Sequence, residues 1–165
     1  MVFNLFKKKS NKQETEIYAP IDGNIVSLEK VPDPVFSQKM MGEGIAIDPS
    51  NGKVFAPIGG KVIQIAPTKH AIGLLSEEGI EVLIHIGLDT VNLKGEGFTV
   101  HVTQNAEVSK GELIMEFDVD YVKQNAPSTI TPIVITNSQN SNKTYELTKE
   151  TIAIQGDTVL IHVTS

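Results

Sequence analysis

Residues 68–87 have the sequence TKHAIGLLSEEGIEVLIHIG, the most informative stretch of the chain. Two apolar runs, 71–75 and 80–86, flank the polar segment SEEG. Apolar runs of this length around a short turn that contains glycine are typical of a β-hairpin. The stretch therefore predicts two antiparallel strands that bring His70 and His85 close together.

The length of the turn decides how the two histidines face each other. If Glu77 and Glu78 form a two-residue loop, His70 lies directly opposite His85. If Gly79 takes the left-handed position of a three-residue loop, the register moves by one residue and the histidines are offset neighbours. Opposed residues have Cβ atoms about 5 Å apart, so the spacing predicts two imidazole rings on one face of the sheet.

A histidine pair favours chemistry over a purely structural role. Two cationic rings repel each other, so at least one is expected to be neutral, and a neutral ring near pH 7 is a nucleophile, a base or a ligand. Thr68 lies two residues before His70, where its hydroxyl can hold a ring tautomer or contact a phosphoryl oxygen; a turn role after Pro67 is the alternative. His101 and His162 have no companion at ligand spacing and are interpreted as strand residues.

Outside the hairpin the pattern is also β. Runs rich in Val, Ile and Thr alternate with Gly, Pro, Asn and Asp, which favours an all-β fold, a sandwich or barrel with one or two short helical turns. Asp33 and Asp118 are candidate caps for helices at 34–40 and 119–125. The clearest predicted strands are 25–28, 61–65, 80–86, 98–103, 113–117, 133–136 and 159–163.

The chain contains an internal repeat. Residues 18–25 (YAPIDGNI) match residues 55–62 (FAPIGGKV) in the order aromatic, Ala, Pro, Ile, any, Gly, any, branched. We interpret the two segments as copies of one supersecondary unit, each with an edge proline and a glycine that permits a tight turn. The repeat is assigned no chemistry.

Composition excludes several classes of protein. The 165 residues carry a net charge of -6, no arginine and no cysteine, so a nucleic-acid partner, a zinc finger and a thiol nucleophile are all disfavoured. No apolar run is long enough to span a bilayer and no signal-peptide core is present, which favours a cytoplasmic protein. A single domain is expected over residues 17–165.

Residues 1–16 are predicted to form a flexible basic and apolar tail. Phe3 and Phe6 are spaced about one helical turn apart and precede the lysine run 7–9. Weak contact with anionic lipid is the alternative to a frayed end.

Several motifs around the histidines closely resemble one protein family. They include Pro67-Thr68-Lys69-His70-Ala71-Ile72, Leu83-Ile84-His85-Ile86-Gly87-Leu88-Asp89-Thr90-Val91 and Leu93-Lys94-Gly95-Glu96-Gly97-Phe98, with further matches at 31–36, 42–44 and 129–135. From about Ile17 to the C-terminus, the chain resembles the glucose-family IIA component of the bacterial phosphoenolpyruvate-dependent sugar phosphotransferase system.

The resemblance implies an antiparallel β-sandwich that acts as a phosphocarrier. His85 matches the phosphoryl-accepting histidine and His70 the supporting one, with Thr68 beside them. The implied donor is the small histidine phosphocarrier protein and the implied acceptor the IIB domain of a sugar transporter, with a regulatory role toward permeases or kinases. The positions that match the family's docking surface are Asp33, Phe36, Met40, Met41, Asp89 and Val91.

Two other functions compete with this interpretation. A zinc hydrolase would use His70, His85 and Asp89 as ligands, although no His-Glu-x-x-His motif is present. A swinging carrier of the biotin or lipoyl type would need a Met-Lys-Met signature, but Gln38 precedes Lys39. No resident cofactor or metal is expected, and zinc shared by the two histidines with a partner carboxylate is conceivable only in a regulatory complex.

Overall fold

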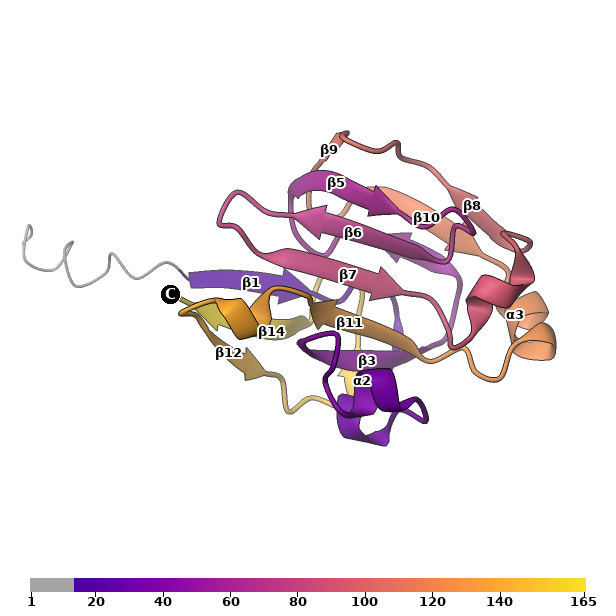
Figure 1. Ribbon diagram of the computed structural model, residues 1–165, viewed down its shortest axis with the longest axis horizontal. Coiled ribbons are helices and arrows are strands. Elements are labelled where there is room, and N and C mark those ends of the chain that lie inside the picture. The colour runs from indigo at the N-terminus through magenta and orange to yellow at the C-terminus, as the bar shows by residue number, and fades with distance from the viewer. Residues whose placement is uncertain (1–13) are drawn as a thin grey trace, which may run out of the picture.

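The hairpin of residues 68–87 lies within the largest sheet of the protein, seen in a computed structural model whose described residues are 14–165 (Figure 1). This eight-stranded sheet has the order β13-β2-β3-β11-β7-β6-β5-β9, and two three-stranded sheets have the orders β1-β14-β12 and β4-β10-β8. All paired strands are antiparallel. The predicted all-β sandwich is confirmed.

The strands are short, as the frequent turn residues predicted. Their bounds are β1 Glu14–Tyr18, β2 Gly23–Ser27, β3 Glu43–Pro49, β4 Lys53–Phe55, β5 Gly60–Ile65, β6 Ala71–Leu75, β7 Glu81–His85, β8 Phe98–Val100, β9 Glu107–Val108, β10 Leu113–Phe117, β11 Thr131–Ile135, β12 Thr144–Leu147, β13 Ile152–Ala153 and β14 Val159–Thr164.

Strand β1 begins at Glu14, three residues before the predicted boundary at Ile17. Glu14 and Glu16 already pair with Thr164 and His162 of β14. Residues 1–13, including the predicted lipid-contacting positions, lie outside the described residues.

Helix is confined to short segments in the described part of the chain. The α-helices are α2 Pro34–Ser37 and α3 Val119–Asn125, and the 3-10 helices are η1 Leu28–Lys30, η2 Thr90–Leu93 and η3 Ser138–Asn140.

Both predicted helix caps are confirmed. The Asp33 carboxylate accepts a hydrogen bond from the N–H of Val35, and that of Asp118 accepts one from Tyr121. These bonds satisfy N–H groups that the first turn of a helix leaves free. Helix α2 ends earlier than predicted, at Ser37, because Lys39 adopts a left-handed conformation (φ 57°) that stops the helix.

Alternating side chains divide the large sheet into two faces. Ile72 and Ile84 point to the main core, where residues of all three sheets meet. Ala71 and Leu83, their neighbours along β6 and β7, belong to a second apolar cluster on the opposite face. Phe36 of α2 joins this second cluster, so the segment around α2 covers the outer face of the sheet (Figure 1).

The internal repeat forms a reciprocal contact between its two copies. The N–H of Tyr18 donates to the carbonyl of Pro57, and the N–H of Phe55 donates to the carbonyl of Pro20. These equivalent bonds of 3.0 and 2.9 Å join the two copies to each other. The repeat therefore has a structural role.

Candidate active site

The hairpin has the offset register rather than the directly opposed one. Ala71, not His70, is paired with His85, so of the two registers that the sequence left open, the three-residue loop is confirmed and the directly opposed one is wrong. The turn has three residues, since the N–H of Ser76 bonds to the carbonyl of Ile80 and Gly79 has a φ of 85°. Glycine adopts this conformation without the steric cost of a Cβ.

His70 reaches His85 because it lies in a loop. In a regular strand of this register, His70 would project to the face opposite His85. Instead it follows Lys69, which has a φ of 63° and donates its N–H to the carbonyl of Ala66. This turn places the two imidazole rings with centroids 4.9 Å apart and planes at 81°. The predicted histidine pair therefore exists, although a turn rather than strand pairing creates it.

The tautomer of His85 is fixed by the main chain. Its Nδ1 lies 2.8 Å from the carbonyl oxygen of Gly87. A carbonyl oxygen only accepts, so in the neutral ring Nδ1 carries the proton and Nε2 carries the lone pair.

The Nδ1 atom of His70 also has a hydrogen-bond partner, the side chain of Thr68. The Thr68 hydroxyl lies 2.8 Å from Nδ1 of His70. A hydroxyl either donates or accepts. When it donates, the His70 proton resides on Nε2 and that nitrogen becomes a hydrogen-bond donor.

Both rings are held in the neutral form at pH 7. Burial and repulsion from His85 lower the pKa of His70 to about 4. Burial also lowers the pKa of His85, although its hydrogen bond to Gly87 and the charges of Asp33 and Asp89 raise it. His85 thus has an unprotonated ring nitrogen, and the groups around it, the Gly87 carbonyl and the two aspartates, would favour a positive charge on the ring.

Phe36 forms one wall of the site. Its ring is 5.1 Å from that of His85 at an interplanar angle of 57°, and the side chain is only 4% exposed. A buried ring in this position limits the rotation of His85 and excludes water from one side. The contact joins residues 49 positions apart in the sequence, so no local pattern indicated it.

The other predicted docking residues are mostly accessible. Met40 and Val91 are 64% and 50% exposed, whereas Met41 is partly buried against the second cluster. Asp33 caps α2, and Asp89 is exposed at the start of η2 with a φ of 55°. Both carboxylates lie close enough to His85 for their negative charges to raise its pKa.

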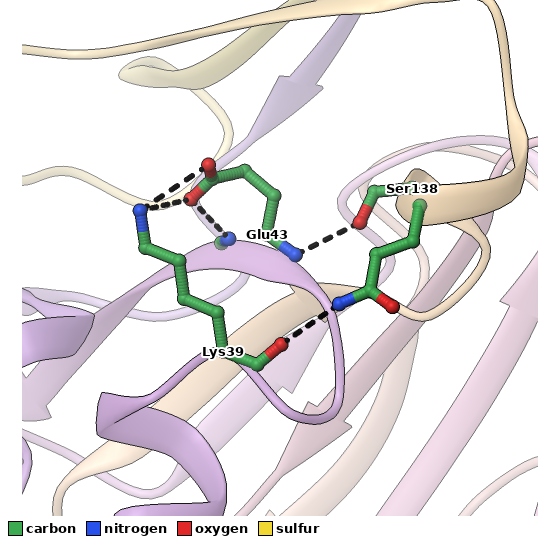
Figure 2. A network of polar contacts seen from close by, with 5 residues as sticks. Lys39, Glu43 and Ser138 are labelled. Carbon is green, nitrogen blue, oxygen red and sulfur yellow. Dashed lines mark hydrogen bonds and ion pairs between the residues drawn. The ribbon is translucent and has the colours of Figure 1, made fainter.

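A polar network anchors the loop that carries Met40. The Lys39 ammonium contacts both carboxylate oxygens of Glu43, at 3.2 and 3.3 Å (Figure 2). Ser138 accepts from the N–H of Glu43, and Gln139 donates to the carbonyl of Lys39. Met40 is therefore presented on a loop with fixed ends.

The remaining histidines are separate from this site. His101 follows β8, which ends at Val100 and is shorter than predicted, and contacts Glu116 at 2.8 Å. His162 lies in β14, as predicted, 3.8 Å from Glu14.

Residues 14–165 contain neither a cluster of three metal-binding side chains nor a membrane-spanning helix. No three His, Asp or Glu side chains are grouped as metal ligands, so the three-ligand zinc centre of the hydrolase hypothesis is not formed. In the same range, no helix is both long and apolar enough to span a membrane.

Comparison with known proteins assigns the chain to a family. Residues 15–141 match the family described as phosphoenolpyruvate-dependent sugar phosphotransferase system, EIIA 1. The glucose-specific EIIA component of Halalkalibacterium halodurans is 47% identical over 169 residues, which cover 94% of this chain and 98% of that protein. The structure of glucose permease IIA from Mycoplasma capricolum has a TM-score of 0.84 and 38% identity, covering 91% of this chain and 96% of that one. The protein belongs to the EIIA 1 family and is a phosphocarrier and phosphotransferase component of the sugar phosphotransferase system.

Proposed function

We propose that His85 is the phosphoryl acceptor and that Nε2 is its nucleophilic atom. The observation that carries this proposal is the bond of 2.8 Å between Nδ1 of His85 and the Gly87 carbonyl. It leaves the lone pair of Nε2 free while burial keeps the ring neutral. No other histidine of residues 14–165 combines a fixed tautomer with a neighbouring imidazole.

The transfer step follows from this geometry. The Nε2 lone pair of His85 forms a bond to phosphorus as the bond between phosphorus and the donor nitrogen breaks, and the electron pair of that bond stays on the donor. The His85 ring becomes positively charged while Nδ1 retains its proton. The Gly87 carbonyl and the carboxylates of Asp33 and Asp89 stabilise this cation, since each of them raises the pKa of His85.

His70 supports the transferred group. With Thr68 donating to its Nδ1, His70 carries its proton on Nε2 and donates a hydrogen bond to a phosphoryl oxygen. The ring distance of 4.9 Å allows both imidazoles to contact one tetrahedral group. Thr68 thus acts on His70 and not directly on the phosphoryl group.

The partners are other proteins of the same system. Family membership implies exchange with a phosphocarrier protein and a sugar transporter. We propose that the donor is the small histidine phosphocarrier protein and the acceptor the IIB domain of a sugar transporter. The names of the two relatives, both of which mention glucose, support a transporter of the glucose class. Regulation of permeases or kinases and a cytoplasmic location belong to the same proposal.

Met40 and Val91 give the docking surface an exposed apolar centre, and Asp33 and Asp89 give it acidic neighbours. These carboxylates suit a partner that brings a basic side chain. The chain has no arginine of its own, so a guanidinium near the phosphoryl group would come from that partner.

The covalent phosphoryl group is proposed as the only group that the protein carries. Two imidazoles supply only two of the four ligands of tetrahedral zinc, so an ion shared by His70 and His85 needs a carboxylate from a partner. Such an ion belongs to a regulatory complex and not to the transfer step.

Reconstitution tests the proposal directly. The protein is incubated with phosphoenolpyruvate, the first enzyme of the system and the histidine phosphocarrier protein, and its intact mass is recorded. A gain of roughly 80 Da that acid removes, with the label mapped to His85, is the expected result. Stoichiometric label on another residue of the wild-type protein would overturn the assignment.

A further inference from the structure

Thr90 carries a buried hydroxyl that the transfer step described above does not use. Its side chain is 0% exposed, and its Oγ1 donates to the carbonyl of Ile86 at 2.5 Å. Ile86 stands between the proposed nucleophile, His85, and Gly87, whose carbonyl fixes the His85 tautomer. The hydroxyl thus acts on the peptide next to the one that holds the ring.

The whole turn after His85 is pinned by hydrogen bonds. The N–H of Ile86 donates to the carbonyl of His70 at 2.8 Å, and the carbonyl of Ile86 accepts from Thr90. The next peptide group has its carbonyl, on Gly87, bonded to His85, and its N–H, on Leu88, bonded to the Ser128 carbonyl at 3.0 Å. The three consecutive peptide groups between His85 and Leu88 therefore each make at least one hydrogen bond, and the Gly87–Leu88 peptide makes two.

The backbone of this turn depends on such support. Gly87 has a φ of 74°, and a Cβ at this position would lie 2.6 Å from Cγ2 of Thr90 and 2.9 Å from the Ser128 carbonyl. Asp89 adopts a left-handed conformation with a φ of 55°, which is unfavourable for a residue with a side chain. A conformation of this kind persists only when surrounding contacts hold it.

We propose that Thr90 is a positioning residue for phosphoryl transfer. Its hydroxyl holds the Ile86 carbonyl so that the Gly87 carbonyl is placed to accept a hydrogen bond from Nδ1–H of His85. Thr90 does not touch the phosphoryl group. It acts by keeping the lone pair on Nε2, the proposed nucleophilic atom. This inference rests on the proposed role of His85.

Two substitutions separate the hydroxyl of Thr90 from its methyl group. Thr90→Val keeps the shape of the side chain, including the methyl that occupies the space where a Cβ of residue 87 would lie, but removes the donor to Ile86. Thr90→Ser keeps the donor and removes the methyl. If the hydroxyl is the positioning group, valine should disturb His85 and serine should not.

The first measurement is the tautomer of His85 in the unphosphorylated protein. Long-range proton–nitrogen correlation spectra of the 15N-labelled chain distinguish a proton on Nδ1 from one on Nε2. We expect wild type and Thr90→Ser to show the Nδ1–H form, and Thr90→Val to show a mixture of both tautomers. If Thr90 has a purely structural role, Thr90→Val should lower the free energy of unfolding but leave the nitrogen signals of His85 unchanged.

The second measurement is the single-turnover rate of phosphoryl acceptance. Thr90→Val should lose about tenfold, less than the roughly hundredfold loss expected when a reacting atom is displaced by about 1 Å, because the ring stays in place and only its tautomer becomes mixed. Thr90→Ser should retain most of the wild-type rate. If Thr90→Val keeps both the tautomer and the rate of the wild type, the proposal is overturned.

Ser76→Ala is the matched control. Ser76 is also a buried hydroxyl residue, 4% exposed, and its Oγ accepts from the N–H of Ile80 at the other end of the same hairpin. Its loss should lower stability and leave the tautomer of His85 unchanged. A tautomer shift in Ser76→Ala would show that any loss of stability disturbs the site, which would overturn a specific role for Thr90.

A variant that fails to fold and a failure of the proposed function can each be distinguished from a failure of the Thr90 proposal. If Thr90→Val does not fold, Thr90→Ser and Thr90→Ala are compared instead, and equal tautomer populations in the two variants count against the hydroxyl. If the wild-type protein accepts its label elsewhere than on His85, the proposed function fails, whatever the Thr90 variants show. A wild type labelled on His85 with an insensitive Thr90 overturns only the present inference.

Discussion

The ring of His70 meets the ring of His85 edge to face, with centroids 4.9 Å apart and an interplanar angle of 81°. The same two residues are joined through the main chain by way of Ile86, whose N–H donates to the His70 carbonyl. The supporting ring and the proposed acceptor are therefore held as one unit, and a group bound to Nε2 of His85 stays within reach of His70.

Substitution of His85 by Gln should abolish phosphoryl acceptance, because the amide lacks the nucleophilic ring nitrogen. Intact mass after incubation with donor measures the result. His101→Gln is the control, since that ring is exposed and bonded to Glu116, and it should remain fully labelled. A fully phosphorylated His85→Gln variant would contradict the proposed mechanism.

Substitution of His70 by Gln should spare acceptance more than onward transfer. The acceptor ring keeps its bond to Gly87, but the phosphoryl oxygens lose the imidazole N–H that Thr68 orients, and the flexible Gln amide does not replace that fixed donor, so transfer to the IIB domain should slow by about a hundredfold. Rapid-quench rates of the two half-reactions measure this difference. Equal losses in both directions would indicate that His70 positions His85 and does not stabilise the transferred group.

The rate of acceptance should resist mild acid. Burial holds the pKa of His85 below its ordinary value of 6.5, so the ring remains mostly neutral where an ordinary histidine is half protonated. The acid limb of the rate profile should therefore lie below pH 6.5. Asp33→Asn, which keeps an effective helix cap, should move this limb further down because it removes a charge that raises the pKa. An acid limb at or above the ordinary histidine value, with no response to Asp33→Asn, would refute the argument.

Stability should fall in acid partly because of His70. Its pKa is about 4 in the folded protein and near 6.5 in the unfolded chain, so between these values the unfolded state binds more protons. The contribution of His70 to stability is fully present above pH 6.5 and is lost as pH falls toward 4. His70→Gln should flatten the pH dependence of the urea midpoint in this window. An unchanged slope would show that His70 titrates alike in both states.

Phe36 and Met40 should respond differently to alanine. Phe36→Ala leaves a cavity beside His85 and should cost about 3–5 kcal/mol in the free energy of unfolding, because the side chain is 4% exposed. Met40→Ala, at 64% exposure, should change stability by less than about 0.5 kcal/mol but raise the KM for the phosphoryl donor. Denaturant unfolding and steady-state kinetics measure the two effects. An unaltered KM in Met40→Ala would remove Met40 from the docking surface.

Local sequence patterns predicted much of the architecture. Strands β5 and β10 and helix α3 lie where turn residues and caps placed them, because their boundaries depend on neighbours in the chain. The caps Asp33 and Asp118 bond to N–H groups only two or three residues away. The repeat at 18–25 and 55–62 was visible for the same reason, although only the fold shows that its copies bond to each other.

The sequence by itself determined that His70 and His85 lie close together, because a hairpin of this length brings its ends into contact. It left the register open, and only the folded chain shows the outcome: the turn at Gly79 gives the offset register, and the left-handed turn at Lys69 then brings His70 to the face of His85. Depressed pKa values and the wall formed by Phe36 also required the folded chain. The physical reason is that turn chemistry acts over a few residues, whereas burial arises from segments that meet only when the sheet is covered.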